Sequence, residues 1–270
     1  MASLLTRPIG RRPSPGDALL NEPPVEIVHT VAKQAQDAVE KQRRRVDDAT
    51  VDVAESLIRG RHGIAYVVVA LGLFGVLFAL VRKQRTAAAD VAITMRVQRQ
   101  RKPWIRRTMM IVSWPGFPPQ SRLIPPVLAA VMWVFGLRLE AAFQFAGWGT
   151  TGISFVVKKF MRRPRPNQPE IRVAISNLGG TSFPSGHVLG YVGVYGFLAF
   201  LAETLIRPRA LRRAIVAGFT ALIALVGPSR IYLGHHWFTD VLASYLLGTS
   251  YLLGLTTLYR RIKARRAGLA

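Results

Sequence analysis

Long apolar runs separated by short polar segments occupy most of the chain after residue 62. The first run, 63–81, contains no charged residue and is long enough to cross a bilayer as a helix. Because every backbone polar group inside a bilayer needs a partner, such runs form helices. The pattern predicts an all-α integral membrane protein, with residues 63–260 forming a bundle of six transmembrane helices. The five further runs are 123–137, 141–157 (the weakest), 188–206, 214–227 and 241–259.

The region before the first apolar run has a different character. Residues 1–24 are rich in Pro, Gly and Arg and show no periodicity, which is typical of a disordered tail. From Val25 to Ile58, apolar residues recur at helical spacing between charged ones, which predicts one or two amphipathic helices. Such helices fit a solvated or partner-packed role or, alternatively, an anchor on a lipid surface. We therefore expect residues 1–62 to form a disordered and amphipathic helical extension, and residues 261–270 a basic tail.

Composition adds a strong positive charge to this picture. The 270 residues include 37 Lys and Arg but 14 Asp and Glu, a formal net charge of +23. Such an excess favours a polyanionic partner, which is nucleic acid, an anionic membrane surface or a phosphorylated substrate. The chain contains no cysteine, so disulfides, thiolate chemistry and cysteine-ligated metals are excluded.

Ionisable residues next to the apolar runs gather in three places, at 158–165, at His187 and at 230–240. With six spans, the third connection, the start of the fourth span and the fifth connection all lie on one side of the membrane. We therefore expect the three clusters to converge. Because ionisable groups at the membrane are costly to keep, their convergence indicates a functional site.

The three clusters also carry ordered motifs. They read "KKFMRRPRP" (158–166), "FPSGH" (183–187) and "SRIYLGHHWFTD" (229–240). These segments resemble the three signature blocks of the type 2 phosphatidic acid phosphatase (PAP2) superfamily, in its bacterial membrane lipid phosphatase branch. Eleven positions match in order and spacing, which makes coincidence negligible. The motifs cover 158–240, and the pattern of spans extends the resemblance over about 63–260.

Five of the matching residues suit phosphate binding. Phosphoryl transfer depends on positioning and on stabilising charge spread over several oxygens. Lys158, Arg165 and Arg230 supply three cations for that purpose. Ser185 and Gly186 lie at the predicted start of the fourth span, where backbone N–H groups bind anions and glycine allows close approach. The remaining bases of the first cluster fit equally well as positive charges that flank a span; they are Lys159, Arg162 and Arg163.

Two histidines and an aspartate suit the chemical steps. His236 is the candidate nucleophile, which forms a phosphohistidine. Asp240 follows four residues later, on the same helical face, and is expected to fix the histidine tautomer. His187 is the candidate general acid, which protonates the leaving oxygen and later activates water. His235 matches a variable position of the family pattern, and we expect it to be an interfacial neighbour of modest effect.

These residues predict an enzyme without a metal or other cofactor. The side-chain cations replace a metal and would repel a divalent ion. The resemblance implies a lipid phosphate or diphosphate substrate: undecaprenyl diphosphate, phosphatidic acid or phosphatidylglycerol phosphate. Hydrolysis by water is the first hypothesis, and transfer of the phosphoryl group to an alcohol is the alternative. A third possibility, a basic scaffold that binds nucleic acid or anionic lipid, leaves the motif spacing unexplained, so no nucleic-acid partner is expected.

The resemblance also implies a location. In bacterial relatives the site faces outwards from the inner membrane and both termini are cytoplasmic, which places the basic segments 207–213 and 260–266 inside, as the positive-inside rule requires. The basic stretch from Ala87 to Arg107 then lies outside. We interpret it as an amphipathic helix at the interface, close to anionic headgroups. The connection "WPGFPP" (114–119) is predicted to be a loop.

Overall fold

The computed structural model describes residues 33–34, 36–37, 39–41, 61–175 and 179–267. The chain divides into two units, residues 1–44 and 45–270. In the first unit the described residues are helical and exposed. The predictions for residues 1–24 lie outside the described residues, as do most of those for 25–58.

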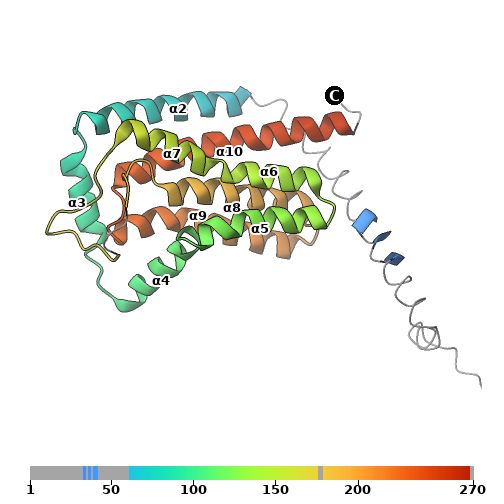
Figure 1. Ribbon diagram of the computed structural model, residues 1–270, viewed down its shortest axis with the longest axis horizontal. Coiled ribbons are helices and arrows are strands. Elements are labelled where there is room, and N and C mark those ends of the chain that lie inside the picture. Colours follow the sequence, from blue (N-terminus) through green and yellow to red (C-terminus); the bar gives the residue numbers. More distant parts are fainter. Residues whose placement is uncertain (1–32, 35, 38, 42–60, 176–178, 268–270) are drawn as a thin grey trace, which may run out of the picture. The chain divides into compact units, whose positions relative to one another are not determined.

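The described part of the second unit consists of helices joined by turns and loops, without a strand, which confirms the predicted all-α class (Figure 1). The elements, in chain order, are α2 (Arg61–Arg82), α3 (Ala87–Val97), α4 (Pro103–Ser113), the 3₁₀ turn η2 (Trp114–Gly116), α5 (Gln120–Val134), α6 (Arg138–Trp148), α7 (Thr150–Met161), α8 (Gly186–Leu205), α9 (Arg209–Tyr232) and α10 (Phe238–Arg266). Because α10 continues to Arg266, most of the predicted basic tail is helical.

Four of the described helices are long and apolar enough to cross a membrane, namely α2, α8, α9 and α10. The second and third predicted spans take a different form. Residues 120–134 form the 15-residue helix α5, and the third run is divided between α6, of 11 residues, and α7, of 12. The division falls at Gly149, whose N–H closes a short turn onto the carbonyl of Ala146 at 2.8 Å. The count of six membrane spans therefore stays a prediction.

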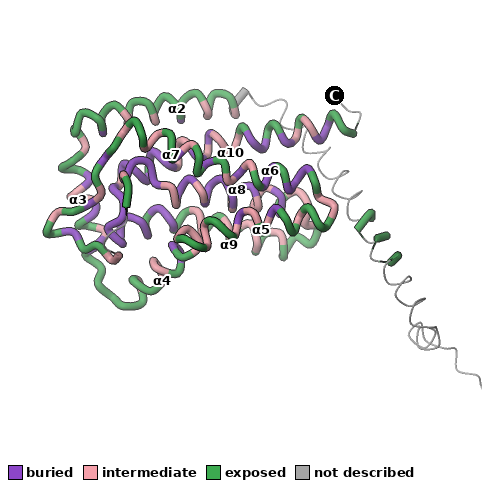
Figure 2. Tube along the Cα trace, viewed as in Figure 1, coloured by how far each residue is buried: buried purple, intermediate pink, exposed green. Residues whose placement is uncertain are grey.

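Helix α8 packs against α6, α7, α9 and α10, and Figure 2 shows buried residues along much of its length. Glycines allow these close approaches. A Cβ atom on Gly193 of α8 would lie 2.1 Å from the carbonyl oxygen of Gly147, so the backbones of α8 and α6 touch at this point. A Cβ on Gly196 would lie 2.6 Å from Leu252 of α10. Small residues at such crossings are typical of membrane helices, and they fix the position of α8.

Helix α2 lies along α10 (Figure 1). The Tyr66 hydroxyl and Thr249 Oγ1 form a hydrogen bond of 2.7 Å, and Phe74 and Phe78 pack against Phe183 near the other end of α2. Several apolar side chains of α2 are exposed, with Ile64 at 70% of its surface. A bilayer accommodates such a face, since lipid tails are as apolar as these side chains.

The sequence suggested that the basic stretch 87–107 is one interfacial helix, but it is not. It forms α3 and the start of α4, because Pro103 suits the first position of a new helix. Helix α3 contacts α9 and α10 and buries Asp90, which is 1% exposed. Helix α4 leaves Trp104 and Ile111 exposed, as an interfacial helix would.

Candidate active site

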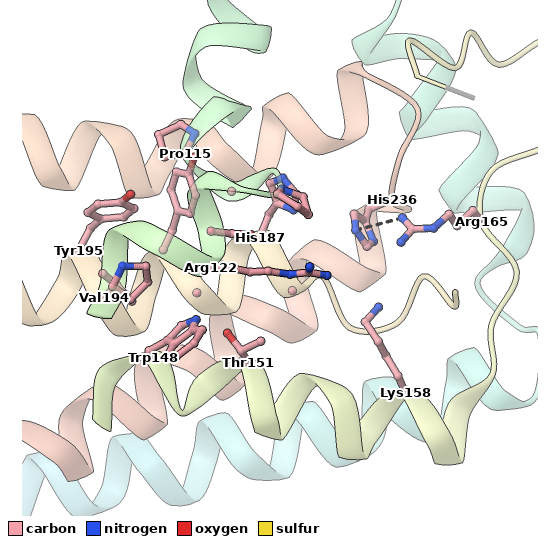
Figure 3. A pocket seen from close by; sticks show the side chains of 17 residues that line it. Pro115, Arg122, Trp148, Thr151, Lys158, Arg165, His187, Val194, Tyr195 and His236 are labelled. Atoms are coloured by element: carbon pink, nitrogen blue, oxygen red, sulfur yellow. Dashed lines mark hydrogen bonds between the residues drawn. The ribbon is translucent and has the colours of Figure 1, made fainter. Parts of the chain in front are cut away.

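The structure brings the three clusters together at one end of the bundle. Helix α7 ends there, α8 and α10 begin there, and α9 ends there. The connections between these helices supply the remaining residues (Figure 3). Five of the eight predicted site residues line one cavity of about 310 Å³: Lys158, Arg165, Gly186, His187 and His236. The other three, Ser185, Arg230 and Asp240, are buried beside it.

His236 and Asp240 are neighbours, but by a different route from the one predicted. Helix α10 begins at Phe238, so His236 precedes it and the two residues do not share a helical face. Asp240 lies in the first turn of α10 and reaches back. Its Oδ2 accepts the backbone N–H of Trp237 at 2.9 Å and lies 3.5 Å from His236 Nδ1. The aspartate therefore both caps the helix and faces the imidazole.

Arg163 holds the other oxygen of Asp240. Its Nη1 donates to Asp240 Oδ1 at 2.6 Å and to Thr239 Oγ1 at 2.7 Å. Its Nη2 donates to Asp90 Oδ2 at 2.6 Å. The side chain is 9% exposed, so Arg163 is a buried bridge and not a positive charge that flanks a span.

Asp90 is a residue that sequence analysis missed. Besides Arg163, its carboxylate accepts the backbone N–H of Thr239 at 2.9 Å and the Thr239 hydroxyl at 2.8 Å. One signal would have indicated it: Asp90 is the single acidic residue in the otherwise basic stretch 82–107. An isolated acidic residue in a basic chain is a candidate for an ion pair in the folded protein.

Lys158 and Arg165 are fixed at the cavity by backbone carbonyls. Lys158 Nζ donates to the carbonyl of Thr181 at 2.6 Å. Arg165 Nη1 donates to the carbonyl of His235 at 2.7 Å and lies 3.4 Å from His236 Nε2, and its Nη2 donates to Gly179 at 3.3 Å. Neither cation pairs with a carboxylate among the described residues. Their charges therefore remain available to an anion.

Arg230 and Ser185 are buried with unused polar atoms. Arg230 is 1% exposed, and neither its Nε nor its Nη1 has a hydrogen-bond partner within the described residues. Its guanidinium group lies over the ring of Phe117, 4.9 Å from the centroid. The Ser185 hydroxyl is also unpartnered, whereas its backbone N–H donates to Ser244 Oγ at 2.7 Å. Because buried donors normally have acceptors, these atoms indicate a ligand site.

The connection 114–119 covers His187. Its first part is the 3₁₀ turn η2 and not an irregular loop. A Cβ on Gly116 would lie 2.3 Å from His187 Cδ2, and the ring of Phe117 meets the imidazole edge-on at 4.9 Å. The His187 Nε2 is buried and has no partner among the described residues. The imidazole is thus held by packing, with one nitrogen unused.

His235 was expected to be interfacial, but the structure does not place it there. It is fully buried, and its ring meets that of Phe117 edge-on at 6.0 Å. Neither ring nitrogen has a partner within the described residues. His235 contacts the site through its backbone carbonyl, which accepts a hydrogen bond from Arg165.

Burial and the nearby cations shift the ionisation of the site. The pKa of His236 is held well below its usual value by burial and by the charges of Lys158 and Arg165. Burial and the charge of Arg165 lower the pKa of Lys158 to about 8. His236 is therefore neutral at pH 7 and has a lone pair, while Lys158 is mostly charged.

The cavity has a charged end and an apolar end. Figure 3 shows Lys158, Arg165 and His236 on one side and Trp148, Val194 and Tyr195 on the other. Arg122 of α5 also lines this cavity and was missed by sequence analysis, because it belongs to none of the motifs. Within the described residues, no group of three or more His, Cys, Asp or Glu side chains is arranged to hold a metal ion.

Comparisons with known proteins agree with this geometry. Residues 135–264 match the PAP2 superfamily. Phosphatidylglycerophosphatase B of Bacillus subtilis (strain 168) is 31% identical over 190 residues, which cover 68% of this chain and 90% of the relative. The chain belongs to the PAP2 superfamily. The crystal structure of the first transmembrane PAP2-type phosphatidylglycerolphosphate phosphatase from Bacillus subtilis superposes with a TM-score of 0.64 at 25% identity, over 73% of this chain and 96% of that one.

Membership of the PAP2 superfamily confirms two predictions. The protein is a phosphatase, since it belongs to the PAP2 superfamily and its relative in that family is named as a phosphatase. It is an integral membrane protein, since it shares its fold with a transmembrane PAP2 phosphatase and has four helices suited to a bilayer.

Proposed function

We propose that this PAP2 protein is a metal-independent lipid phosphatase that acts through a phosphohistidine on His236. One observation carries the proposal. A neutral imidazole with Asp240 at one nitrogen lies against a cavity that is cationic at that end and apolar at the other. This arrangement matches a substrate with an anionic head and an apolar chain.

The phosphate binds at the charged end of the cavity. Lys158 and Arg165 contact its oxygens there, and the unused Nε and Nη1 of Arg230 complete the set of cations. The first backbone N–H groups of a helix have no intrahelical acceptor, so those of Gly186 and His187 add further donors. The Ser185 hydroxyl supplies one more. Several donors on one phosphate stabilise the charge that develops during transfer.

Nucleophilic attack comes from Nε2 of His236. Asp240, near Nδ1, keeps the proton on that nitrogen and leaves the lone pair on Nε2. As the nitrogen–phosphorus bond forms, the bond between phosphorus and the ester oxygen breaks. His187 donates a proton from its unpartnered Nε2 to that oxygen, because the anionic phosphate favours the protonated imidazole. His187 then accepts a proton from water, whose oxygen attacks phosphorus and releases inorganic phosphate and His236.

The lipid chain occupies the apolar end. Trp148, Val194 and Tyr195 line it, and α8 continues from there across the membrane. The similarity to phosphatidylglycerophosphatase B favours a phospholipid with a terminal phosphate. Phosphatidylglycerol phosphate is therefore the first candidate substrate, followed by phosphatidic acid and undecaprenyl diphosphate.

The test uses purified protein in detergent micelles with each of these three lipids. We expect release of inorganic phosphate that persists in EDTA, stops with vanadate and is absent in His236→Ala. Because the nitrogen–phosphorus bond of a phosphohistidine hydrolyses in acid, turnover is quenched with denaturant at alkaline pH, and mass spectrometry should then find one phosphoryl group, about 80 Da, on the peptide that contains His236. Loss of activity in EDTA that Mg²⁺ restores would overturn metal independence, and full activity of His236→Ala would overturn the mechanism.

We further propose that the enzyme lies in the bacterial inner membrane with its site on the extracytoplasmic side. The basic segments 207–213 and 260–266 support this orientation, because the first follows the end of α8 and the second forms the last turns of α10, and both of these ends lie opposite to the site. The basic residues of α3 and α4 then meet anionic headgroups on the outer side. A cytoplasm-dependent reporter fused after residue 270 should be active, and an inactive but intact reporter would reverse the assignment.

A further inference from the structure

Arg122 is a cation in the cavity that the proposed mechanism leaves unused. It is the third residue of α5, and its side chain is exposed and lines the cavity. In Figure 3 the guanidinium group extends towards the end where Lys158 and His236 lie. It belongs to none of the sequence motifs, and it comes from a helix that supplies no other charged residue to the cavity.

The position of Arg122 is not explained by the stability of α5. A cation in the first turn of a helix opposes the helix dipole, which favours acidic side chains there. No described carboxylate lies within ion-pair distance of Arg122. A charge that neither stabilises its helix nor pairs with a neighbour is free to serve a ligand.

The transferred phosphate already has its own set of cations. Lys158 and Arg165 line the cavity beside His236, and Arg230 is buried next to them. Arg122 shares the cavity with Lys158 and Arg165 and also with the apolar residues Trp148 and Val194. An anion beside Arg122 therefore lies between the reacting phosphate and the lipid chain.

We infer that Arg122 binds a second phosphate of the substrate, one that connects the transferred phosphate to the lipid chain. This inference rests on the proposed function. Two lipid classes share that chemistry: a lipid diphosphate, whose inner phosphate follows at once, and a phospholipid whose phosphodiester is separated from the terminal phosphate by a short polyol. Arg122 makes the enzyme favour either of them over a lipid with one phosphate, because guanidinium groups bind phosphate oxygens in pairs.

The experiment compares selectivity in Arg122→Gln and in the wild type. Initial rates are measured in micelles for phosphatidylglycerol phosphate, undecaprenyl diphosphate and phosphatidic acid. We expect the ratio of kcat/KM for the favoured two-phosphate lipid to that for phosphatidic acid to fall by about 10- to 100-fold, the usual effect of losing a charged hydrogen-bond donor. A fall confined to one of the two lipids identifies which spacing Arg122 serves. Arg122→Lys should retain part of the selectivity, since it keeps the charge but not the paired donors.

Arg106→Gln is the matched control, since Arg106 is an exposed arginine of α4 outside the cavity. It should leave the selectivity ratio at the wild-type value. An equal loss on all three lipids in Arg122→Gln would overturn the inference, because it would mean that the charge merely attracts anionic lipid. A different result would contradict the proposed function itself: wild-type protein that releases phosphate from none of the three lipids.

Discussion

Asp90 and Arg163 form a buried ion pair of 2.6 Å that joins α3 to the candidate active site. The other arm of the same guanidinium group holds Asp240 at 2.6 Å, and Asp240 faces His236. Two carboxylates thus share one arginine, and Asp240 is oriented by a residue that lies 150 positions earlier in the sequence. This chain of contacts explains why Asp90 of α3 is buried although its surroundings in the sequence are basic.

Asp90→Asn should weaken both folding and turnover. Asp90 accepts buried hydrogen bonds from Arg163 and from the N–H and hydroxyl of Thr239, and weakening them costs about 1–3 kcal/mol of stability. Since Arg163 then holds Asp240 less firmly, we expect kcat to fall by roughly 10- to 100-fold, as when outer groups that orient a functional side chain are removed. Thermal unfolding in detergent and steady-state rates measure the two effects.

Glu203→Gln is the control for this prediction. Glu203 pairs with Arg212 at 3.5 Å, but its side chain is 57% exposed. Its loss should change stability by at most about 1 kcal/mol and should not change kcat. If Asp90→Asn behaves in the same way as Glu203→Gln, the Asp90–Arg163 pair has no part in the site.

The two adjacent histidines should respond unequally to mutation. His236→Ala removes the proposed nucleophile, so activity should fall by about 10³-fold or more. His235 contacts Arg165 through its backbone carbonyl, which His235→Ala retains. That variant should keep substantial activity while losing about 1–3 kcal/mol of stability, because a buried ring is removed from beside Phe117. Equal loss of activity in the two variants, at equal amounts of folded protein, would contradict the assignment of His236.

Activity should fall at alkaline pH because of Lys158. Its pKa is lowered to about 8, so its positive charge is present below that pH and is lost above it. Since kcat/KM reports the free enzyme, it should decline above pH 8 as the phosphate site loses a cation. Lys158→Arg should move the decline to higher pH, because arginine keeps its proton. A decline at the same pH in both proteins would assign the titration to another group.

Particular residues show what the sequence predicts and what it does not. Motif spacing predicted that His236 and Asp240 act together, because both stand at matching positions of one signature block. It did not predict how they meet, since the start of α10 at Phe238 depends on packing. Asp90 and Arg122 were missed because the ion pair of the first and the position of the second at the cavity arise only in the folded protein. The division of the third apolar run at Gly149 was missed for a similar reason, since hydropathy alone does not register a break between two helices.

Gly116→Ala should impair catalysis while leaving the bundle folded. The added Cβ would lie 2.3 Å from His187 Cδ2, so the imidazole or the turn that covers it must move. A small displacement of a proton donor lowers rates strongly, and we expect kcat to fall by about 10-fold or more. Gly218→Ala, in α9, is the control, because its Cβ meets no atom within 4 Å. A Gly116→Ala enzyme with the kcat of the Gly218→Ala enzyme would show that the position of His187 is not set by the turn above it.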